Sequence, residues 1–305
     1  MNSGVILHRS ISTITLHRKP KLKPSIVILT YNSELSIADT LQSVVSLSDD
    51  IHVVDSFSKD RTVEIAQAFG TRVVEHGFEN YGAQRNWAIT SLDLKYRWQL
   101  HLDADERLTP ELLKEIASLP SESSVNGFYI PRVMTYLGRY IRHGGMYPTW
   151  HMRLFRTGYG ICESRKYDQH FYVTAGETGQ LKGEMIDDLR MPLTEWTFRH
   201  NRWSDAEVEE LSAGEGTGRV EARLGGNPVE RKRYLRRFYN EAPLFVRPFA
   251  LFFYRYFLRL GFLDGKEGFI FYVLQTFWFR FLVDAKLFER RKALAEEKQA
   301  LRHPV

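Results

Sequence analysis

The stretch "RWQLHLDADERLTP", residues 97–110, shows most directly how this chain folds. Polar and apolar residues alternate over 97–102, as in a half-buried strand. Asp103 and Asp105 follow at once, and Thr109 with the proline after it has the residue types that begin a helix. Two carboxylates this close repel each other unless water screens them or a cation binds them. Mg²⁺ and Mn²⁺ prefer such oxygen ligands and leave positions for substrate phosphates. A solvated loop is the alternative, and the surrounding sequence must decide.

The preceding sequence repeats the same unit of a buried strand followed by an amphipathic helix. Strands are expected at 25–30, 51–55, 71–75 and 97–102, with helices from Ser33, between Asp60 and Gly70, over 81–92 and from Thr109 to about Leu119. This alternation predicts a largely parallel sheet with helices on both faces. Ligands of such sheets bind beyond the carboxyl ends of the strands, where Thr30, Asp55 and Asp103 lie.

Composition limits the class of protein. The 305 residues are 43% apolar and 26% charged, which is enough for one or two sizeable cores. Cys162 is the sole cysteine, so no intrachain disulfide forms and a reducing compartment is expected. The net charge of +5 admits an anionic partner: nucleic acid, anionic lipid or a phosphorylated substrate. Residues 1–24 lack the uninterrupted apolar run of a signal peptide and are expected to form a basic arm.

Motif absences narrow the ligand further. The first strand leads into "TYNSE" rather than a G-x-G-x-x-G turn, and no G-x-x-x-x-G-K-[ST] loop occurs, so dinucleotide and P-loop chemistry are disfavoured. What remains are Asp55 at a strand end, Arg85 in the third helix and the acid pair. Asp55 can accept from a base or ribose, Arg85 can hold phosphate, and a cation on Asp105 can bridge a diphosphate. Together these residues predict a nucleotide-diphosphate site.

Four motifs in order resemble those of the family 2 glycosyltransferases, which have the GT-A fold: "SIVILTYNSE", "VVDSFSKDRT", "NYGAQRNWAI" and "HLDADERLTPEL". The resemblance covers roughly residues 25–120 and implies a nucleotide-sugar donor and Mg²⁺ or Mn²⁺. It implies that the nucleotide base and its surroundings are held by Thr30, Tyr31 and Asp55, the nucleotide portion by Arg85, the ribose or metal by Asp103, and the metal by Asp105. Members with a D-x-D motif of this form resemble inverting enzymes.

The segment from Arg165 to Leu189 resembles the acceptor-side part of membrane-linked members of this family. An acid commonly precedes the histidine there, whereas this chain has Gln169 before His170. Asp168 is therefore the expected catalytic base, with a loop aspartate satisfied by backbone amides as the alternative. Weaker candidates for a further metal ligand are His170, Asp187, Asp188 and His200, and Ser204 is a candidate N-cap of the helix that leaves this region.

Aromatic residues are concentrated near the C-terminus, where residues 234–288 hold 19 of the chain's 41 Phe, Tyr and Trp residues. The longest uncharged run there, 268–279, has 12 residues, too few to cross a bilayer. The segment is expected to lie in the membrane interface, with "RKRYLRR" (231–237) drawn to anionic lipid and the arginines at 247, 255, 259 and 280 reaching outward. The alternative is a helical core packed on the catalytic domain or on a dimer partner.

The sequence thus predicts an α/β, GT-A-like protein with a mostly parallel Rossmann-like sheet. A basic arm (1–24) would precede a catalytic domain (25–200) and a helical, membrane-associating region (201–305). The expected activity is inverting, metal-dependent transfer of a sugar to a lipid-linked or polysaccharide acceptor at the cytoplasmic face of the inner membrane. A metal-dependent nucleotidyltransferase and a basic nucleic-acid-binding protein are the alternatives, and the acidic strand ends argue against nucleic acid as a partner. A homo-oligomer is left open.

Overall fold

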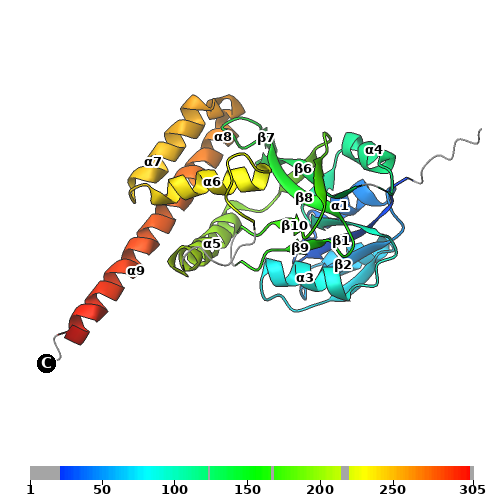
Figure 1. The fold of residues 1–305 in the computed structure, drawn as a ribbon, viewed down its shortest axis with the longest axis horizontal. Helices are drawn as coiled ribbons and strands as arrows, with labels where there is room; N and C mark the ends of the chain where they lie inside the picture. The colour runs from blue at the N-terminus through cyan, green and yellow to red at the C-terminus, as the bar shows by residue number, and fades with distance from the viewer. Residues whose placement is uncertain (1–20, 123, 166–167, 214–219, 303–305) are drawn as a thin grey trace, which may run out of the picture.

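A computed structural model describes residues 21–122, 124–165, 168–213 and 220–302 (Figure 1). Most of the predicted basic arm, residues 1–20, lies outside these ranges. The remainder of that arm is part of the fold, because Leu22 is buried and its N–H donates to Leu119 O. The strands in chain order are β1 (Pro24–Thr30), β2 (Ile51–Asp55), β3 (Arg72–Glu75), β4 (Trp98–Asp103), β5 (Glu106–Leu108), β6 (Val125–Tyr136), β7 (Arg139–Ile141), β8 (Thr149–Arg156), β9 (Gly160–Cys162), β10 (Phe171–Val173), β11 (Glu177–Gln180) and β12 (Met185–Leu189).

The large sheet is parallel in its first half and mixed in its second. Its path is β3-β2-β1-β4-β8-β6-β12-β5, with β7 and β11 also paired to β6. β1, β2, β3 and β4 run parallel, whereas β8 is antiparallel to both β4 and β6, and β5 is antiparallel to β12. The sequence predicts the parallel strands but not the antiparallel ones beyond residue 120, because the direction of a strand leaves no mark on a short apolar run.

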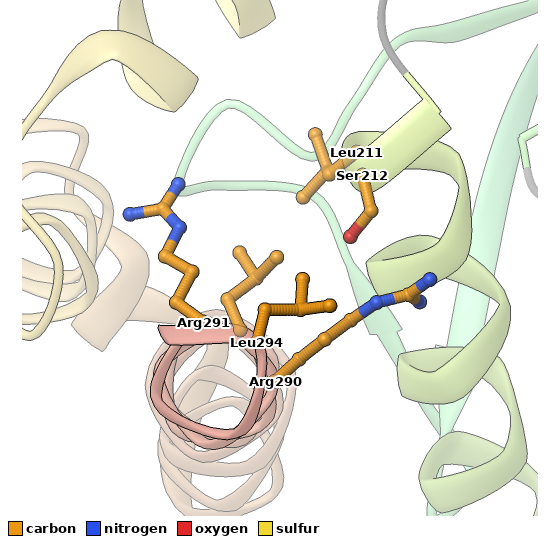
Figure 2. A pocket seen from close by; sticks show the side chains of 6 residues that line it. Leu211, Ser212, Arg290, Arg291 and Leu294 are labelled. Carbon is orange, nitrogen blue, oxygen red and sulfur yellow. The ribbon is translucent and has the colours of Figure 1, made fainter. Parts of the chain in front are cut away.

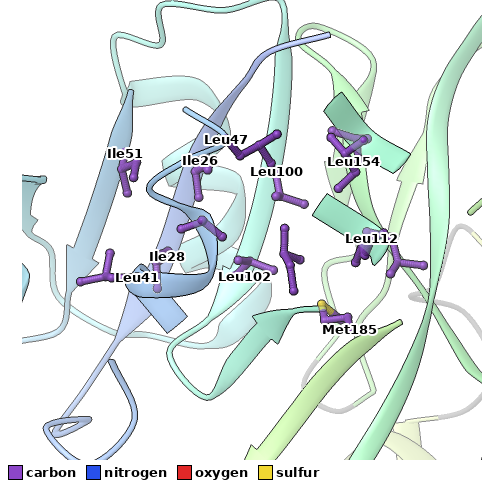
Figure 3. Packing of buried hydrophobic residues seen from close by; sticks show 14 of the residues in the cluster. Ile26, Ile28, Leu41, Leu47, Ile51, Leu100, Leu102, Leu112, Leu154 and Met185 are labelled. Carbon is purple, nitrogen blue, oxygen red and sulfur yellow. The ribbon is translucent and has the colours of Figure 1, made fainter. Parts of the chain in front are cut away.

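Helices cover both faces of the sheet, as predicted. The helices of this part are α1 (Ile37–Val44), α2 (Thr62–Ala68), α3 (Tyr81–Ser91) and α4 (Pro110–Ser118). Leu41 of α1 and Leu112 of α4 pack with Ile26 and Leu100 in one apolar cluster (Figure 3). Ala88 of α3 packs with Val27 and Val54 on the opposite face. The expected helix start at Thr109 is confirmed, since its side chain accepts from Leu112 N.

The C-terminal part consists of α5 (Leu193–Ala213), α6 (Pro228–Glu241), α7 (Val246–Phe253), the π-helical turn η1 (Tyr254–Leu258), the 3-10 turn η2 (Gly261–Asp264), α8 (Gly265–Phe271), the π-helical segment η3 (Tyr272–Trp278) and α9 (Phe279–Arg302). Figure 1 shows α9 projecting away from the sheet, with the C-terminus at its far end. The predicted domain boundary at residue 200 falls inside α5. Ser204 is not an N-cap: it is buried within α5, and its hydroxyl donates to Asn201 O at 2.6 Å.

The helical region is packed on one side and exposed on the other. Phe271 and Tyr272 are fully buried against Tyr136 of β6 and Trp196 of α5, which confirms the packed core in part. Large apolar side chains remain exposed on the other side, from Phe249 to Phe269. None of the helices in the described ranges has both the length and the apolar character needed to cross a membrane.

The packed side predicts a pH dependence of stability. His200 is buried, stacks on Trp196 at 3.5 Å between ring centroids, and has Nε2 2.9 Å from Gln275 Oε1. Burial lowers its pKa to about 4, and the charge of Arg199 adds to that lowering. An unfolded histidine has a pKa of about 6.5. Between these two pKa values His200 is protonated in the unfolded chain and neutral in the folded chain. The free energy of unfolding therefore falls as pH falls from about 6.5 toward 4.

We expect the free energy of unfolding to fall by about 1.4 kcal/mol per pH unit from this histidine alone. Urea denaturation of wild type and His200→Gln between pH 7 and pH 4 measures the difference in slope. A variant with the wild-type slope would show that His200 does not remain neutral in the fold.

Candidate functional site

The carboxyl ends of three parallel strands meet at one edge of the sheet. Thr30 pairs with Asp55, and Leu29 pairs with Asp103, so the strand-end residues predicted from the sequence are level with one another. Tyr31, which follows β1 at this edge, is 61% exposed. The sheet register therefore brings together the residues that we expected to line a ligand site.

The turn that carries the acid pair is held by its own backbone. Ala104 O accepts from Thr40 Oγ1 of α1 at 2.7 Å, and Asp105 O accepts from Asp188 N of β12 at 2.8 Å. β5, which the sequence did not reveal, follows immediately and pairs Glu106 with Asp187. The turn is therefore fixed between the central strand β4 and the sheet edge.

Asp103 is fully engaged by two arginines. Both of its oxygens lie 3.0 Å from Arg85 NH2, and Oδ2 lies 2.7 Å from Arg153 NH2. Burial alone would raise the pKa of Asp103, but the charges of Arg153 and Arg85 hold it below its ordinary value. Arg85 is buried, so it does not lie on a solvated helix face, and in this structure it binds Asp103.

Glu106, the third acid of the opening stretch, is a partner for Arg153. Its Oε1 lies 2.6 Å from Arg153 NH2, and its Oε2 accepts from Asp103 N at 3.0 Å. Arg132 of β6 lies 3.5 Å from the same Oε1 and 3.0 Å from Asp187 Oδ2. The acids and arginines of this edge thus form a continuous cluster.

Asp105 differs from its neighbours. No side-chain hydrogen bond or ion pair reaches its carboxylate from the residues that the structure describes. Burial raises its pKa to about 8, and Asp187, Asp103 and Glu106 contribute to the rise. An acid surrounded by acids is stabilised by a proton or by a cation.

The donor set fits Mg²⁺ or Mn²⁺, because it consists of carboxylate oxygens. Within the described ranges, no group of three or more His, Cys, Asp and Glu side chains is arranged to hold a metal. That is compatible with Mg²⁺, which binds through one or two carboxylates and takes its other ligands from substrate phosphates and water. Asp105 is the residue best placed to bind the ion, and Asp103 is placed beside it by the turn.

Asp55 is buried, and its carboxylate accepts hydrogen bonds from the end of β1 and from the loop that follows β2. Its Oδ1 accepts from Thr30 Oγ1 at 2.8 Å and from Ser58 Oγ at 2.6 Å, and its Oδ2 accepts from Ser58 N at 2.7 Å. These bonds shape the loop after β2. In this structure Asp55 and Thr30 position that loop, while Tyr31 offers the exposed surface.

Asp168 lies in a second charged cluster, which includes residues of α6. Its Oδ1 lies 3.1 Å from Lys232 Nζ and 3.4 Å from His170 Nε2, and its Oδ2 lies 2.6 Å from Arg236 NH1. Burial would raise its pKa, but Lys232, His170 and Arg236 hold it well below the ordinary value. Arg132 also lowers the pKa of Lys232, so the two clusters are within electrostatic range.

Three cations of the basic segment of α6 pair with carboxylates of the protein, although the Lys232 side chain is 48% exposed. The attraction of this segment to anionic lipid stays a prediction. Lys232 and Arg236 bind Asp168, Arg236 also reaches Glu207 at 2.7 Å, and Arg233 binds Glu163. These pairs attach α6 to the catalytic part. They also remove most of the basis for a nucleic-acid-binding protein.

The weaker metal-ligand candidates are distributed differently. Asp187 lies beside the acid pair, whereas Asp188 binds Thr135 Oγ1 at 2.6 Å, and His200 lies in the packed core of the helical region. Sequence reasoning missed Arg132 and Arg153. Each of these arginines lies within a mainly apolar strand segment. A charge buried in such a segment costs free energy unless it is paired, so this position could have indicated a buried ion pair.

A separate pocket of 270 Å³ lies between the end of α5 and α9 (Figure 2). It has no carboxylate or histidine in its lining, so it offers no alternative metal site. The lining residues are Leu211, Ser212, Leu287, Arg290, Arg291 and Leu294.

Comparison with known proteins identifies the class. Residues 25–176 match the model of glycosyl transferase family 2, and the chain belongs to this family through that domain. The GT-A-like α/β architecture expected from the sequence agrees with this assignment. Over 94 residues the chain is 40% identical to an uncharacterized glycosyltransferase of Rickettsia bellii, covering 31% of each chain. It is 39% identical over 94 residues to one of Rickettsia typhi, covering 31% of this chain and 32% of the relative.

The chain therefore matches about a third of the length of these curated relatives. Among solved structures, it superposes on residues 1–349 of TarS from S. aureus in complex with UDP-GlcNAc, with a TM-score of 0.45 and 14% identity over 88% of this chain and 92% of TarS. A glucosyl-3-phosphoglycerate synthase from Mycobacterium tuberculosis, in complex with Mn²⁺, UDP and glucosyl-3-phosphoglycerate, gives a TM-score of 0.29 and 20% identity over 37% of this chain and 44% of that one.

Proposed function

We propose that the protein is an inverting, metal-dependent glycosyltransferase that moves a sugar from a nucleotide-diphosphate sugar to a lipid-linked or polysaccharide acceptor. The observation that carries this proposal is the Asp105 carboxylate, which lies at this edge of the sheet among three acids. Among the described residues it has no hydrogen bond or ion pair with a cation, and Arg199 acts on it through its charge alone. A bound Mg²⁺ or Mn²⁺ would supply positive charge to the leaving diphosphate.

The chain's own residues would divide the remaining work. The exposed Tyr31 ring can stack on the base, while Asp55 and Thr30 hold the loop beside it. Arg85 keeps Asp103 ionised at the metal edge and is the residue assigned to the nucleotide portion of the donor. Arg153 fixes Asp103 and Glu106 in one orientation and so preorganises the turn.

Direct displacement requires a base that takes the proton of the acceptor hydroxyl, and Asp168 is our candidate. Lys232 and Arg236 keep its carboxylate ionised, which the role requires, although the same cations weaken it as a base.

We expect Asp168→Asn to lower kcat by about 10²–10³-fold, because a base acts on the acceptor. Asparagine is tolerated at the backbone φ of +58° found at this position, so the fold should persist. Nucleotide binding, measured by calorimetry, should be unchanged. Equal loss of donor binding and turnover would instead assign Asp168 a structural role at the site.

The enzyme reaction itself is tested by incubating the protein with Mn²⁺, a panel of nucleotide sugars and candidate acceptors. Release of a nucleoside diphosphate supports glycosyl transfer. Pyrophosphate formed from nucleoside triphosphates would support the nucleotidyltransferase instead.

We further propose that the exposed side of the helical region lies in a membrane interface. Its apolar face is formed by side chains each at least 45% exposed: Phe249, Phe253, Tyr254, Phe257, Leu258, Leu260, Phe262, Leu263 and Phe269. Aromatic rings at this density suit the headgroup region of a bilayer. Arg247 and Arg280 do not reach outward as predicted, because they bind Asp284 and Glu207.

We expect the protein to sediment with anionic vesicles and to release at least partly at high salt. Phe253→Asn/Phe257→Asn should weaken this partition by about tenfold or more, since each ring contributes about 1.5–3 kcal/mol when removed from water. A control pair of exposed apolar residues in the catalytic part, Leu35→Asn/Phe78→Asn, should have no effect. If both double variants bound the vesicles equally well, the apolar face would not be the surface that binds the membrane.

A further inference from the structure

The four arginines that interrupt the aromatic segment, at 247, 255, 259 and 280, fall into two groups. Arg247 Nε lies 2.8 Å from Asp284 Oδ1, and Arg280 NH1 lies 2.7 Å from Glu207 Oε1, so both charges are neutralised inside the protein. Arg255 of η1 and Arg259, the residue that follows η1, have no carboxylate partner among the residues that the structure describes.

Arg255 is the more unusual of the pair because its side chain is partly buried. The hydrogen-bond partner found for it is the thioether of Met146, a weak acceptor. Burial lowers its pKa to about 10, and the charge of Arg280 adds to the lowering. The group is nevertheless charged at neutral pH. Removing a charge from water destabilises the protein when its partner is so weak, and an anion bound to the guanidinium would offset that loss.

Arg259 lies next to Arg255 on the same turn of chain. A side-chain carbon added at Gly145 would lie 3.7 Å from the Arg259 guanidinium carbon, so the two arginines lie against consecutive residues, Gly145 and Met146. Arg259 NH1 also donates to Tyr254 Oη at 3.2 Å.

The turn that supports both arginines is rigid. Gly144 has a φ of +61° and donates its N–H to Arg259 O at 2.9 Å, and a Cβ there would lie 2.5 Å or less from the Tyr272 ring. Asp264 accepts from the N–H groups of Arg142 and His143 and from Tyr272 Oη. This carboxylate is therefore committed to the turn itself.

We propose that Arg255 and Arg259, supported by the Gly144–Met146 turn, bind the phosphate group of a membrane lipid at the base of the apolar face. Two guanidinium groups match a phosphate in charge and in hydrogen-bond geometry. The exposed rings of Tyr254 and Phe257 lie on the same turn, so the acyl chains of a lipid whose phosphate sits here would continue along apolar surface. This inference rests on the proposed membrane association.

The test uses the full-length protein and two kinds of phosphatidylcholine vesicle at matched surface charge, one carrying phosphatidic acid and the other oleate. We expect wild type to bind the phosphatidic acid vesicles about tenfold more tightly, as charge-assisted hydrogen bonds to one phosphate would give. Arg255→Gln/Arg259→Gln should bind both vesicles equally. Arg290→Gln/Arg291→Gln, which removes two exposed charges from α9, should keep the preference.

Folding does not obscure this test, because Arg255→Gln leaves no carboxylate unpaired and should not lower the melting temperature. Arg255→Lys/Arg259→Lys, which keeps the charge but not the paired donors, should show an intermediate preference.

A wild-type preference that survives in the glutamine variant, or no preference in wild type, would overturn the phosphate site while leaving membrane association intact. Failure of wild type to bind either vesicle would overturn both. Stabilisation by inorganic phosphate that is lost in the glutamine variant, without a lipid preference, would show a site for free phosphate and overturn the lipid assignment.

Discussion

Asp105→Asn is expected to lower turnover by about 10³-fold, the largest effect on activity of any single change considered. It removes the carboxylate of the acid pair that has no hydrogen-bond or ion-pair partner among the described residues and is our candidate ligand for the cation. The amide has nearly the same shape, and no described side chain loses a hydrogen bond or an ion pair. Stability should therefore be retained or increased, since Asp187, Asp103 and Glu106 would no longer face another acid. Turnover with saturating Mn²⁺ and the melting temperature are the two measurements.

Asp93→Asn is the matched control, because Asp93 is an exposed loop acid outside the strand-end cluster. It should change neither quantity. Near-normal turnover of Asp105→Asn would remove Asp105 from the metal site. A large fall in melting temperature would instead show that Asp105 supports the fold.

Arg153→Met is expected to have the largest effect on stability. The guanidinium is 3% exposed and bridges Asp103 and Glu106, and Glu106 is itself buried. Methionine fills much of the same volume but leaves a buried carboxylate without its main cation, a change that costs about 3–5 kcal/mol. Urea denaturation at neutral pH measures the loss.

Arg97→Met is its control, because the pair that Arg97 makes with Glu122 is exposed on both sides and should contribute less than about 1 kcal/mol. A loss of stability in Arg153→Met no larger than in the control would contradict the view that Arg153 holds the acid cluster together.

Local sequence signals were sufficient where one short segment determines the structure. The strand at 51–55 has the predicted bounds, and Thr109 caps the helix that follows it, as predicted. Ser204 misled because serine caps many helices, whereas here its hydroxyl bonds back to the preceding turn. The helix begins earlier, at Leu193, so that Trp196 and His200 can enter the core.

Pairing across long sequence distances could not be predicted. The cations of α6 read as a basic surface, but Glu163, Asp168 and Glu207, which neutralise them, are remote in the sequence. The same holds at the site, where Arg153 lies about fifty residues from Asp103 and becomes its partner only because β8 runs antiparallel to β4. The sequence therefore indicates where the acids lie, but the cations that pair with them can be identified only once the order and direction of the strands are known.

The attachment of α6 to the catalytic part also affects how membrane association should be studied. Removing the chain from about residue 230 onward would leave Glu163, Asp168 and Glu207 without their cations, so such a truncation is expected to destabilise the catalytic domain. Changes confined to the apolar face are the better test.

Thermal stabilisation by nucleoside diphosphates tests most directly whether this sheet edge is a cation-dependent nucleotide-sugar site. A ligand that binds only the folded protein raises the melting temperature, and the rise grows with the logarithm of its concentration divided by its Kd. At least one diphosphate of a panel covering the common bases should raise the melting temperature of wild type in Mn²⁺. The same compound should have little effect in EDTA or with Asp105→Asn. No shift with any diphosphate, or an equal shift with and without the metal and Asp105, would contradict the account.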